Sequence, residues 1–351
     1  MNIQDEIIAV VGAGSWGTSI AQLLADKGHK VKLWVYEPEL CEIIKNSREN
    51  TYYLPGYKLS ENIEPHHDME KVVKGRQIIV MVVPSHVYRS VALKMIPFLE
   101  NDAIIVSATK GIENETLLTM EGVWKDVLPP DKKIRFSCLA GPSFAKEVIR
   151  KIPTAITVAS KDENVAKTVQ LLFATDYFRV YTSSDVIGLE LAGAIKNVIA
   201  IAAGMCDGMG FGHNTRAALI TRGLAEMARL GVRLGAHPLT FSGLAGIGDL
   251  LLTCTGDLSR NRTVGYLIGQ GKKLETILSE MRMVAEGVKT AKSVYFLAKK
   301  VGVEMPICEQ VYAILYEGQD PREAVKILMT RALKHELEHH NDTVIHVNNS
   351  E

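Results

Sequence analysis

Short apolar runs and longer amphipathic segments alternate along the first half of the chain, a pattern typical of βα units around a parallel sheet. Several apolar runs are continuous in Val and Ile, as expected of strands that helices cover on both faces. The predicted strands are residues 7–11, 31–35, 77–83, 103–108, 135–140, 154–159 and 178–181. The predicted helices between them are residues 15–27, 87–99, 115–127 and 163–174.

From about residue 185 the strand pattern ends and helical patterns take over. The predicted helices there are residues 186–206, 215–230, 274–279, 289–300 and 309–316. We therefore expect an α/β fold in which a domain with a mostly parallel sheet, residues 1–186, precedes an all-helical domain, residues 187–335. Residues 336–351 form a polar tail.

Composition and charge argue against several classes of protein, among them nucleic-acid-binding, membrane and disulfide-rich proteins. The 351 residues include 40 Lys and Arg and 40 Asp and Glu, so no overall field draws nucleic acid or an anionic membrane to the chain. Five scattered cysteines without a C-x-x-C pair indicate reduced thiols and a cytoplasmic protein. Residues 187–205 have the length of a membrane span, but Glu190 and Lys196 lie inside them, which favours a buried core helix.

The first predicted strand leads into the sequence GAGSWG, in which Gly12, Gly14 and Gly17 have the spacing G-x-G-x-x-G. In dinucleotide-binding folds such glycines allow a tight turn, a close approach of the pyrophosphate, and close packing of helix on strand. The alternative is an ordinary tight turn between a strand and a helix. The strand before, the helix after and the acid Glu37, twenty residues beyond Gly17, favour a dinucleotide site of the Rossmann type.

The residues after the second predicted strand bear on the choice of cofactor. Glu37 would meet a ribose 2′-hydroxyl and repel a 2′-phosphate, which favours NADH. Tyr36 can stack on an adenine, and Lys32 is a basic side chain within reach of the same end of the cofactor. NADH is therefore the preferred cofactor, and NADPH stays open.

Lys196 lies in the most apolar predicted helix, where the residues at helical spacing around it are small and apolar. Burial disfavours the charged ammonium and lowers its pKa, which suits a general acid or base near neutral pH. Asp249 lies in the apolar segment SGLAGIGDLLLTC, where an unpaired carboxylate is costly, so we expect it to pair with Lys196. The alternative is a lysine that reaches solvent or pairs only structurally.

Three further segments carry groups suited to a phosphate. Lys110 and the turn of residues 141–143 each follow a predicted strand, at the edge where open α/β sheets bind ligands. Residues 259–262, with the sequence SRNR, offer hydrogen-bond donors and forked guanidinium groups. A solvated surface or an ordinary helix cap is the alternative for each of them.

One motif points to a different chemistry. His335–His339, with the sequence HELEH, matches the zinc motif H-E-x-x-H. A third ligand is missing at the required spacing, and the flanking residues are a polar tail. We therefore expect no metal site and no zinc protease.

Nine motifs follow one another from residue 7 to about residue 330: GAGSWGTSIA, VPSH, ATKGIE, GPSFAKEV, LAGAIKNVIAIAAG, GLAGIGDLLLTC, SRNR, AEGVKTA and EMPICEQVYAILYEG. In this order they resemble the NAD(P)-dependent glycerol-3-phosphate dehydrogenase family. The GAIKN and GDLLLTC blocks are specific to that family, whereas the glycine motif is shared with many dinucleotide-binding proteins. The polar tail lies outside the pattern.

The resemblance implies a Rossmann-like domain and a helical domain with the active site between them. It implies reversible reduction of dihydroxyacetone phosphate at C2 by NAD(P)H, giving sn-glycerol 3-phosphate for phospholipid synthesis. By resemblance the catalytic residues are Lys196, the proton donor, with Lys110, Asp249 and Thr253. The implied substrate contacts are Lys110, Gly141, Ser143, Lys196, Asn197, Asp249, Ser259, Arg260 and Asn261. The implied cofactor contacts, with the glycine motif included, are Gly12, Gly14, Ser15, Trp16, Gly17, Tyr36, Tyr53, Lys110, Ala145, Arg260, Val284 and Glu286.

Two other functions fit parts of the sequence. A two-domain dehydrogenase acting on a different keto or hydroxy acid would share the architecture, but the SRNR and GAIKN segments count against it. A dinucleotide-sensing or scaffold protein would bind the cofactor without turnover, and the buried lysine–aspartate pair would then be an unexplained cost. We expect no nucleic-acid or membrane partner, and the apolar helical half suggests a homodimer.

Overall fold

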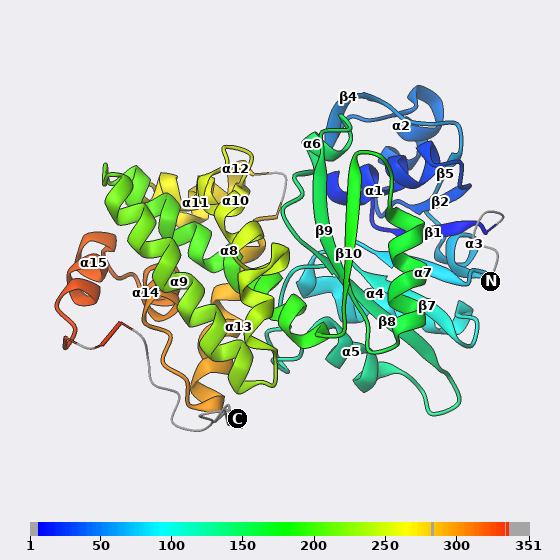
Figure 1. Cartoon of the computed structure of the whole chain (residues 1–351). Helices are drawn as coiled ribbons and strands as arrows, with labels where there is room; N and C mark the ends of the chain where they lie inside the picture. Colours follow the sequence, from blue (N-terminus) through cyan, green and yellow to red (C-terminus); the bar gives the residue numbers. More distant parts are fainter. Residues whose placement is uncertain (1–5, 282–283, 334, 337–351) are drawn as a thin grey trace, which may run out of the picture.

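The computed structural model describes residues 6–281, 284–333 and 335–336. Figure 1 shows a sheet flanked by helices, built from the first half of the chain, beside a bundle of helices from the second half. The predicted α/β fold with an all-helical second half is thereby confirmed. Residues 337–339 of the zinc-like motif and the tail at 337–351 lie outside the described residues, so the expectations for them stay predictions.

The first half is organised around an eight-stranded sheet with the order β10-β9-β8-β7-β6-β1-β2-β5. Neighbours from β8 to β5 run parallel, β9 pairs antiparallel with β8, and β10 pairs parallel with β9. Apolar residues fill both faces of the central strands, because helices cover both. The bounds are β1 Ile8–Val11, β2 Val31–Trp34, β5 Ile63–His66, β6 Ile78–Met81, β7 Ala103–Ser107, β8 Ile134–Ala140, β9 Thr154–Ala159 and β10 Phe178–Ser183.

Two sets of helices pack on the sheet, each with its apolar stripe against alternate residues of the strands. The first set is α1 Ser15–Asp26, α2 Pro38–Ser47 and α7 Glu163–Phe173, and the second is α3 Met69–Val73, α4 Tyr88–Met95 and α5 Met120–Val127. The helix predicted at residues 115–127 is too long. Leu117 has a left-handed φ of 62°, so the regular helix begins only at Met120.

The apolar pattern predicts neither β5, α2 and α3 nor the helices at residues 249–255, 260–269 and 321–329. It also misses several shorter elements. They are the hairpin of β3 Glu49–Asn50 and β4 Leu54–Lys58, the short helix α6 Ala145–Val148, the 3₁₀ turns Ser85–Val87, Ile96–Phe98 and Pro238–Ser242, and the π turn Leu244–Gly248. The β3–β4 hairpin contacts the glycine loop, because Asn50 donates a hydrogen bond to the Ala13 carbonyl at 2.8 Å.

Helix α8, Val186–Gly208, is the central element of the second half. It packs against α9 His213–Arg233, α10 Asp249–Thr255, α11 Arg260–Gly269, α13 Glu286–Val301 and α14 Pro306–Tyr316, while α12 Leu274–Glu280 and α15 Pro321–Met329 lie further out. Among the described residues, α8 alone is long and apolar enough to cross a membrane, and 89% of its most apolar window is buried inside the protein. Its surroundings are those of a core helix.

Helices α8 and α11 touch backbone to backbone. A Cβ on Gly204 would lie 2.0 Å from the Arg262 carbonyl oxygen, and one on Gly265 would lie 1.9 Å from that of Ile201. Both distances are far below van der Waals contact, so a side chain at either position would push the helices apart. This approach brings the middle of α8 close to the first turn of α11.

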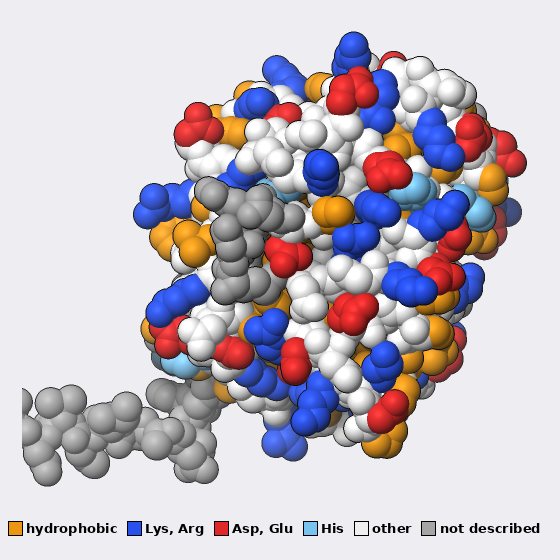
Figure 2. All heavy atoms as spheres, turned by 90° about the vertical axis from the view of Figure 1, so that its right-hand side faces the viewer, with side chains coloured by type: hydrophobic (Ala, Val, Ile, Leu, Met, Phe, Trp, Pro, Cys, Tyr) orange, Lys and Arg blue, Asp and Glu red, His pale blue; other side chains and the backbone are white. Residues whose placement is uncertain are grey.

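Charged side chains are mixed on the face of the sheet half that Figure 2 shows. Acidic and basic groups alternate over the described part of this face, and neither sign gathers into a continuous patch. The distribution agrees with the equal numbers of acidic and basic residues in the sequence.

Candidate active site

A cavity of about 620 Å³ lies between the two halves of the chain. The sheet half contributes loops that follow β1, β6, β7 and β8, at the edge where open α/β sheets bind ligands. The helical half contributes α8, α10 and the first turn of α11. Of the residues expected at the site, the cavity is lined by Gly12, Gly14, Ser15, Trp16, Gly17, Tyr36, Tyr53, Lys110, Ser143, Ala145, Lys196, Asn197, Asp249, Thr253, Ser259, Arg260, Asn261, Val284 and Glu286, together with Glu37.

The glycine loop between β1 and α1 has the shape that a dinucleotide pyrophosphate requires. Gly12 has a φ of +117°, and a Cβ there would lie 2.5 Å from the Val82 carbonyl oxygen, while a Cβ on Gly17 would lie 1.9 Å from the carbonyl oxygen of Gly12. A Cβ on Gly14 would meet nothing within 4 Å, so at this position the backbone is open to a ligand. The buried indole nitrogen of Trp16 has no hydrogen-bond partner among the described residues, so it is available as a donor. These features fit the cofactor.

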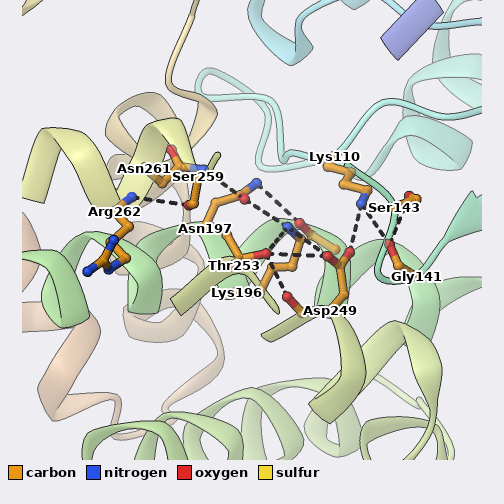
Figure 3. A network of polar contacts seen from close by, with 11 residues as sticks. Lys110, Gly141, Ser143, Lys196, Asn197, Asp249, Thr253, Ser259, Asn261 and Arg262 are labelled. Carbon is orange, nitrogen blue, oxygen red and sulfur yellow. Dashed lines mark hydrogen bonds and ion pairs between the residues drawn. The ribbon is translucent and has the colours of Figure 1, made fainter. Parts of the chain in front are cut away.

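Lys196 and Asp249 form a buried charged pair beside the cavity (Figure 3), with exposures of 5% and 2%. Lys196 Nζ lies 3.2 Å from Asp249 Oδ1, and it donates hydrogen bonds to Thr253 Oγ1 at 2.7 Å and to Asn197 Oδ1 at 3.1 Å. Lys110 Nζ donates to the other carboxylate oxygen of Asp249 at 2.7 Å. The expected Lys196–Asp249 pair is present, and Lys110 is a second, nearer partner of the same carboxylate.

Burial and mutual attraction set the protonation of this cluster. Burial lowers the pKa of Lys196 to about 8, while Asp249 favours the ammonium and Lys110 disfavours it. Burial alone would raise the pKa of Asp249, but the two ammonium groups outweigh it and hold that pKa below its ordinary value. Asp249 is therefore a carboxylate, and Lys196 can gain and lose a proton near neutral pH.

Two asparagines fix the position of the Lys196 ammonium. Asn197 Oδ1 accepts from Lys196 and also from Asn261 Nδ2 at 2.9 Å. Asn261 Oδ1 in turn accepts from the backbone N–H of Gly287 at 2.9 Å. This network joins α8, α11 and α13, so the lysine is oriented by three helices at once.

The start of α13 contacts both halves of the chain. The carboxylate of Glu286 accepts hydrogen bonds from the Ser85 backbone N–H at 3.2 Å and the Ser85 hydroxyl at 2.6 Å. Arg260 Nη1 donates to the Val284 carbonyl at 3.1 Å. Burial lowers the pKa of Arg260 and raises that of Glu286, and each charge partly offsets the shift of the other.

The SRNR segment does not act as one group of donors. Ser259 Oγ accepts from the backbone N–H of Arg262 at 3.2 Å and so caps α11. The Arg262 side chain donates to Asp207 at 2.9 Å and to Asp257 at 3.0 Å, and Figure 3 shows it directed away from Lys196. The helical period places residue 262 on another side of α11 than residues 260 and 261, which line the cavity.

Gly141 also departs from the expected lining. It does not line the cavity, but its carbonyl oxygen accepts from Lys110 Nζ at 3.3 Å and from the Ser143 hydroxyl at 3.0 Å. Nearby, Ser19 of α1 donates to the Ala145 carbonyl at 2.8 Å, which ties α6 to the helix after the glycine loop.

Comparison with known proteins identifies the family to which this chain belongs. Residues 7–166 match the profile of the NAD-dependent glycerol-3-phosphate dehydrogenase N-terminus, and residues 185–326 match that of its C-terminus. A Syntrophobacter fumaroxidans protein named glycerol-3-phosphate dehydrogenase (NAD(P)+) is 66% identical over 331 residues, which are 94% of this chain and 97% of that protein. The chain belongs to the NAD-dependent glycerol-3-phosphate dehydrogenase family. It is therefore an NAD(P)-dependent oxidoreductase.

Solved structures agree with this assignment. The glycerol-3-phosphate dehydrogenase of Coxiella burnetii has a TM-score of 0.90 and 39% identity, over 93% of this chain and 99% of its own. The yeast enzyme, from Saccharomyces cerevisiae, has a TM-score of 0.78 and 28% identity, over 92% of this chain and 99% of its own. D-mandelate dehydrogenase, at 12% identity and a TM-score of 0.61, shares the fold alone. The Rossmann-like first half is confirmed.

The dehydrogenase cavity contains residues to which sequence reasoning assigned no role. His86, from the VPSH motif, lines it, and Ser85 binds Glu286 across 201 residues of sequence. The motif marked this segment as part of the family pattern, but no local signal connects it with α13. Such a contact becomes visible only once the two halves are brought together.

Proposed function

We propose that the chain catalyses the reversible, NAD(P)H-dependent reduction of dihydroxyacetone phosphate to sn-glycerol 3-phosphate. The observation that carries the proposal is the buried Lys196 ammonium, with a pKa of about 8, held by Asp249, Thr253 and Asn197 beside the cavity. A ketone that accepts a hydride becomes an alkoxide, and a nearby ammonium both stabilises that charge and protonates it.

Different groups at the cavity perform the separate parts of this reaction. Bound reduced nicotinamide supplies the hydride for C2 of the ketone. Lys196 donates a proton to the C2 oxygen, so that the carbonyl becomes a secondary alcohol, and in the reverse direction neutral Lys196 removes that proton. Asp249 favours the protonated lysine, while Thr253 and Asn197 hold its nitrogen in place.

We assign the substrate phosphate to the first turn of α11 and the loops opposite it. Arg260 supplies a forked cation, and Ser259 and Asn261 lie beside it at a helix N-terminus, where backbone N–H groups favour an anion. Lys110 lines the same cavity from the sheet half and shares Asp249 with Lys196, with Gly141 and Ser143 beside it. The cationic groups on both sides suit a phosphorylated three-carbon substrate better than a neutral one.

The cofactor is assigned to the glycine-loop side of the cavity. Gly12, Gly14 and Gly17 with Ser15 and Trp16 would hold the pyrophosphate, and Tyr36, Glu37 and Tyr53, which also line the cavity, would lie toward the adenosine. The remaining contacts are assigned to Lys110, Ala145, Arg260, Val284 and Glu286. Glu37 supports a preference for NADH, because a carboxylate repels the 2′-phosphate of NADPH.

The test follows cofactor absorbance at 340 nm with dihydroxyacetone phosphate, in parallel with NADH and NADPH. Oxidation of the cofactor only when the ketone is present, and faster with NADH, is the expected result. Dihydroxyacetone without its phosphate is the matched control, and it should react far more slowly. Tight cofactor binding without oxidation would refute the proposed reaction.

The oligomeric state, the compartment and the use of the product complete the proposal. Phe296, Tyr316 and Ile327 expose apolar surface on the helical half, which supports a homodimer that sedimentation can test. The buried, unpaired cysteines fit a cytoplasmic enzyme. Its product would feed phospholipid synthesis.

A further inference from the structure

A series of hydrogen bonds connects the glycine loop with the acid that follows β2. Asn50 of the β3–β4 hairpin is fully buried, and its Nδ2 donates to the Ala13 carbonyl and to Thr18 Oγ1, both at 2.8 Å. Asn50 Oδ1 accepts from the backbone N–H of Tyr53 at 3.0 Å. The Tyr53 hydroxyl donates to Glu37 Oε1 at 2.6 Å. The hairpin therefore joins two separate parts of the dinucleotide site.

The orientation of Glu37 depends on this connection. Glu37 occupies the N-cap position of α2, but its side chain does not cap that helix. A glutamate that is only partly buried and has three rotatable bonds would otherwise sample many orientations. The bond to Tyr53 selects one of them, on the wall of the cavity that both residues line.

We propose that Tyr53 is a positioning residue for cofactor choice, whose hydroxyl holds the Glu37 carboxylate where it accepts a ribose 2′-hydroxyl and repels a 2′-phosphate. The inference rests on the proposed function, in which a dinucleotide binds at the glycine loop. Selectivity of this kind needs a fixed charge, because a carboxylate that can turn away into solvent neither binds the hydroxyl reliably nor excludes the phosphate.

The hairpin offers a clean variant and a matched control. The Tyr53 ring packs against the core of the sheet half, so Tyr53→Phe removes the hydroxyl and keeps the packing. Tyr52, the next residue, is 36% exposed and is not part of the cavity lining, and its ring meets that of Tyr53 edge-on at 6.3 Å. Tyr52→Phe therefore deletes a hydroxyl from the same hairpin at a side chain outside the cavity lining.

The experiment measures kcat and KM for NADH and for NADPH at saturating dihydroxyacetone phosphate. The proteins are the unaltered chain, Tyr53→Phe, Tyr52→Phe, Glu37→Ala and the double variant Tyr53→Phe/Glu37→Ala. In Tyr53→Phe the ratio of kcat/KM for NADH to that for NADPH should fall about tenfold, the effect of losing one hydrogen bond to a charged group. The change should appear in KM, with kcat within about twofold, because Tyr53 is not among the residues that bind Lys196 or Asp249. Tyr52→Phe should match the unaltered chain, and Tyr53→Phe should have no further effect once Glu37 is alanine.

Three results would overturn the inference while the proposed function stands. The cofactor ratio could stay unchanged in Tyr53→Phe although Glu37→Ala shifts it. It could fall equally with and without Glu37, in which case Tyr53 contacts the cofactor directly. Glu37→Ala itself could leave the ratio unchanged, which would remove the selectivity that Tyr53 is inferred to support. Failure of the unaltered chain to oxidise either cofactor would instead refute the proposed function.

Discussion

Replacing Asp249 by Asn should change the pH at which the enzyme works, because the carboxylate is what keeps Lys196 protonated. The carboxylate lies 3.2 Å from Lys196 Nζ, and both groups are buried. Opposite charges about 4 Å apart interact by about 4 kcal/mol at an effective dielectric constant of 20, and each 1.36 kcal/mol moves a pKa by about one pH unit. Asn is of the same size and leaves Lys110 as an uncompensated neighbouring cation.

The direction of the expected pH shift follows from the reduction reaction, because that reaction needs protonated Lys196. In the unaltered chain kcat/KM for the ketone should decline above about pH 8, where Lys196 loses its proton. In Asp249→Asn this decline should begin about two to three pH units lower, which means a loss of about a hundredfold at pH 7.5 and partial recovery at pH 6.

The assay is NADH oxidation at 340 nm from pH 5.5 to 9.5, with thermal unfolding measured on the same samples. Asp257→Asn is the matched control, because Asp257 lies between α10 and α11 in the same segment and its side chain is 96% exposed. A folded Asp249→Asn protein whose activity declines at the same pH as the unaltered chain would refute the role given to this carboxylate.

Two further variants test other parts of the structure. At saturating NADH, Arg260→Met should raise the KM for dihydroxyacetone phosphate about tenfold or more, since it removes a charged hydrogen-bonding group. Because Arg260 is also assigned to the cofactor, NADH is kept saturating, and the slow reaction of unphosphorylated dihydroxyacetone should then barely change. An equal loss with both ketones under these conditions would show that Arg260 does not bind the phosphate. Gly265→Ala should lower the free energy of unfolding in urea by about 1–3 kcal/mol, because its Cβ would lie 1.9 Å from the Ile201 carbonyl oxygen. An unchanged free energy of unfolding would show that the two helices accommodate a side chain at this position.

The sequence predicted those features that a short stretch of chain determines. Continuous Val and Ile runs such as residues 78–81 and 103–107 identified the buried strands, because strands covered on both faces must be apolar throughout. The glycine motif and the apolar surroundings of Lys196 are local as well. Family resemblance supplied the remaining candidate residues.

What the sequence could not predict depends on contacts between distant segments. The β3–β4 hairpin has no apolar run, because β3 is two residues long and β4, with the sequence LPGYK, is mostly exposed. Its importance lies in the bond from Tyr53 to Glu37. Arg260 and Arg262 are chemically alike in sequence, and only the rotation of α11 separates the one lining the cavity from the one paired with Asp207. Lys110 as the nearer partner of Asp249 likewise depends on how the two halves meet.

The most direct measurement is the turnover of Lys196→Met together with its affinity for NADH. Met keeps most of the volume and leaves Asp249 paired with Lys110 at 2.7 Å, so the fold and the cofactor side of the cavity should be retained. We expect kcat for dihydroxyacetone phosphate reduction to fall by about 10²–10⁴, the usual contribution of a general acid, with the Kd for NADH changed by less than about threefold. Turnover within a few-fold of the unaltered chain would contradict the assignment of Lys196 as the proton donor.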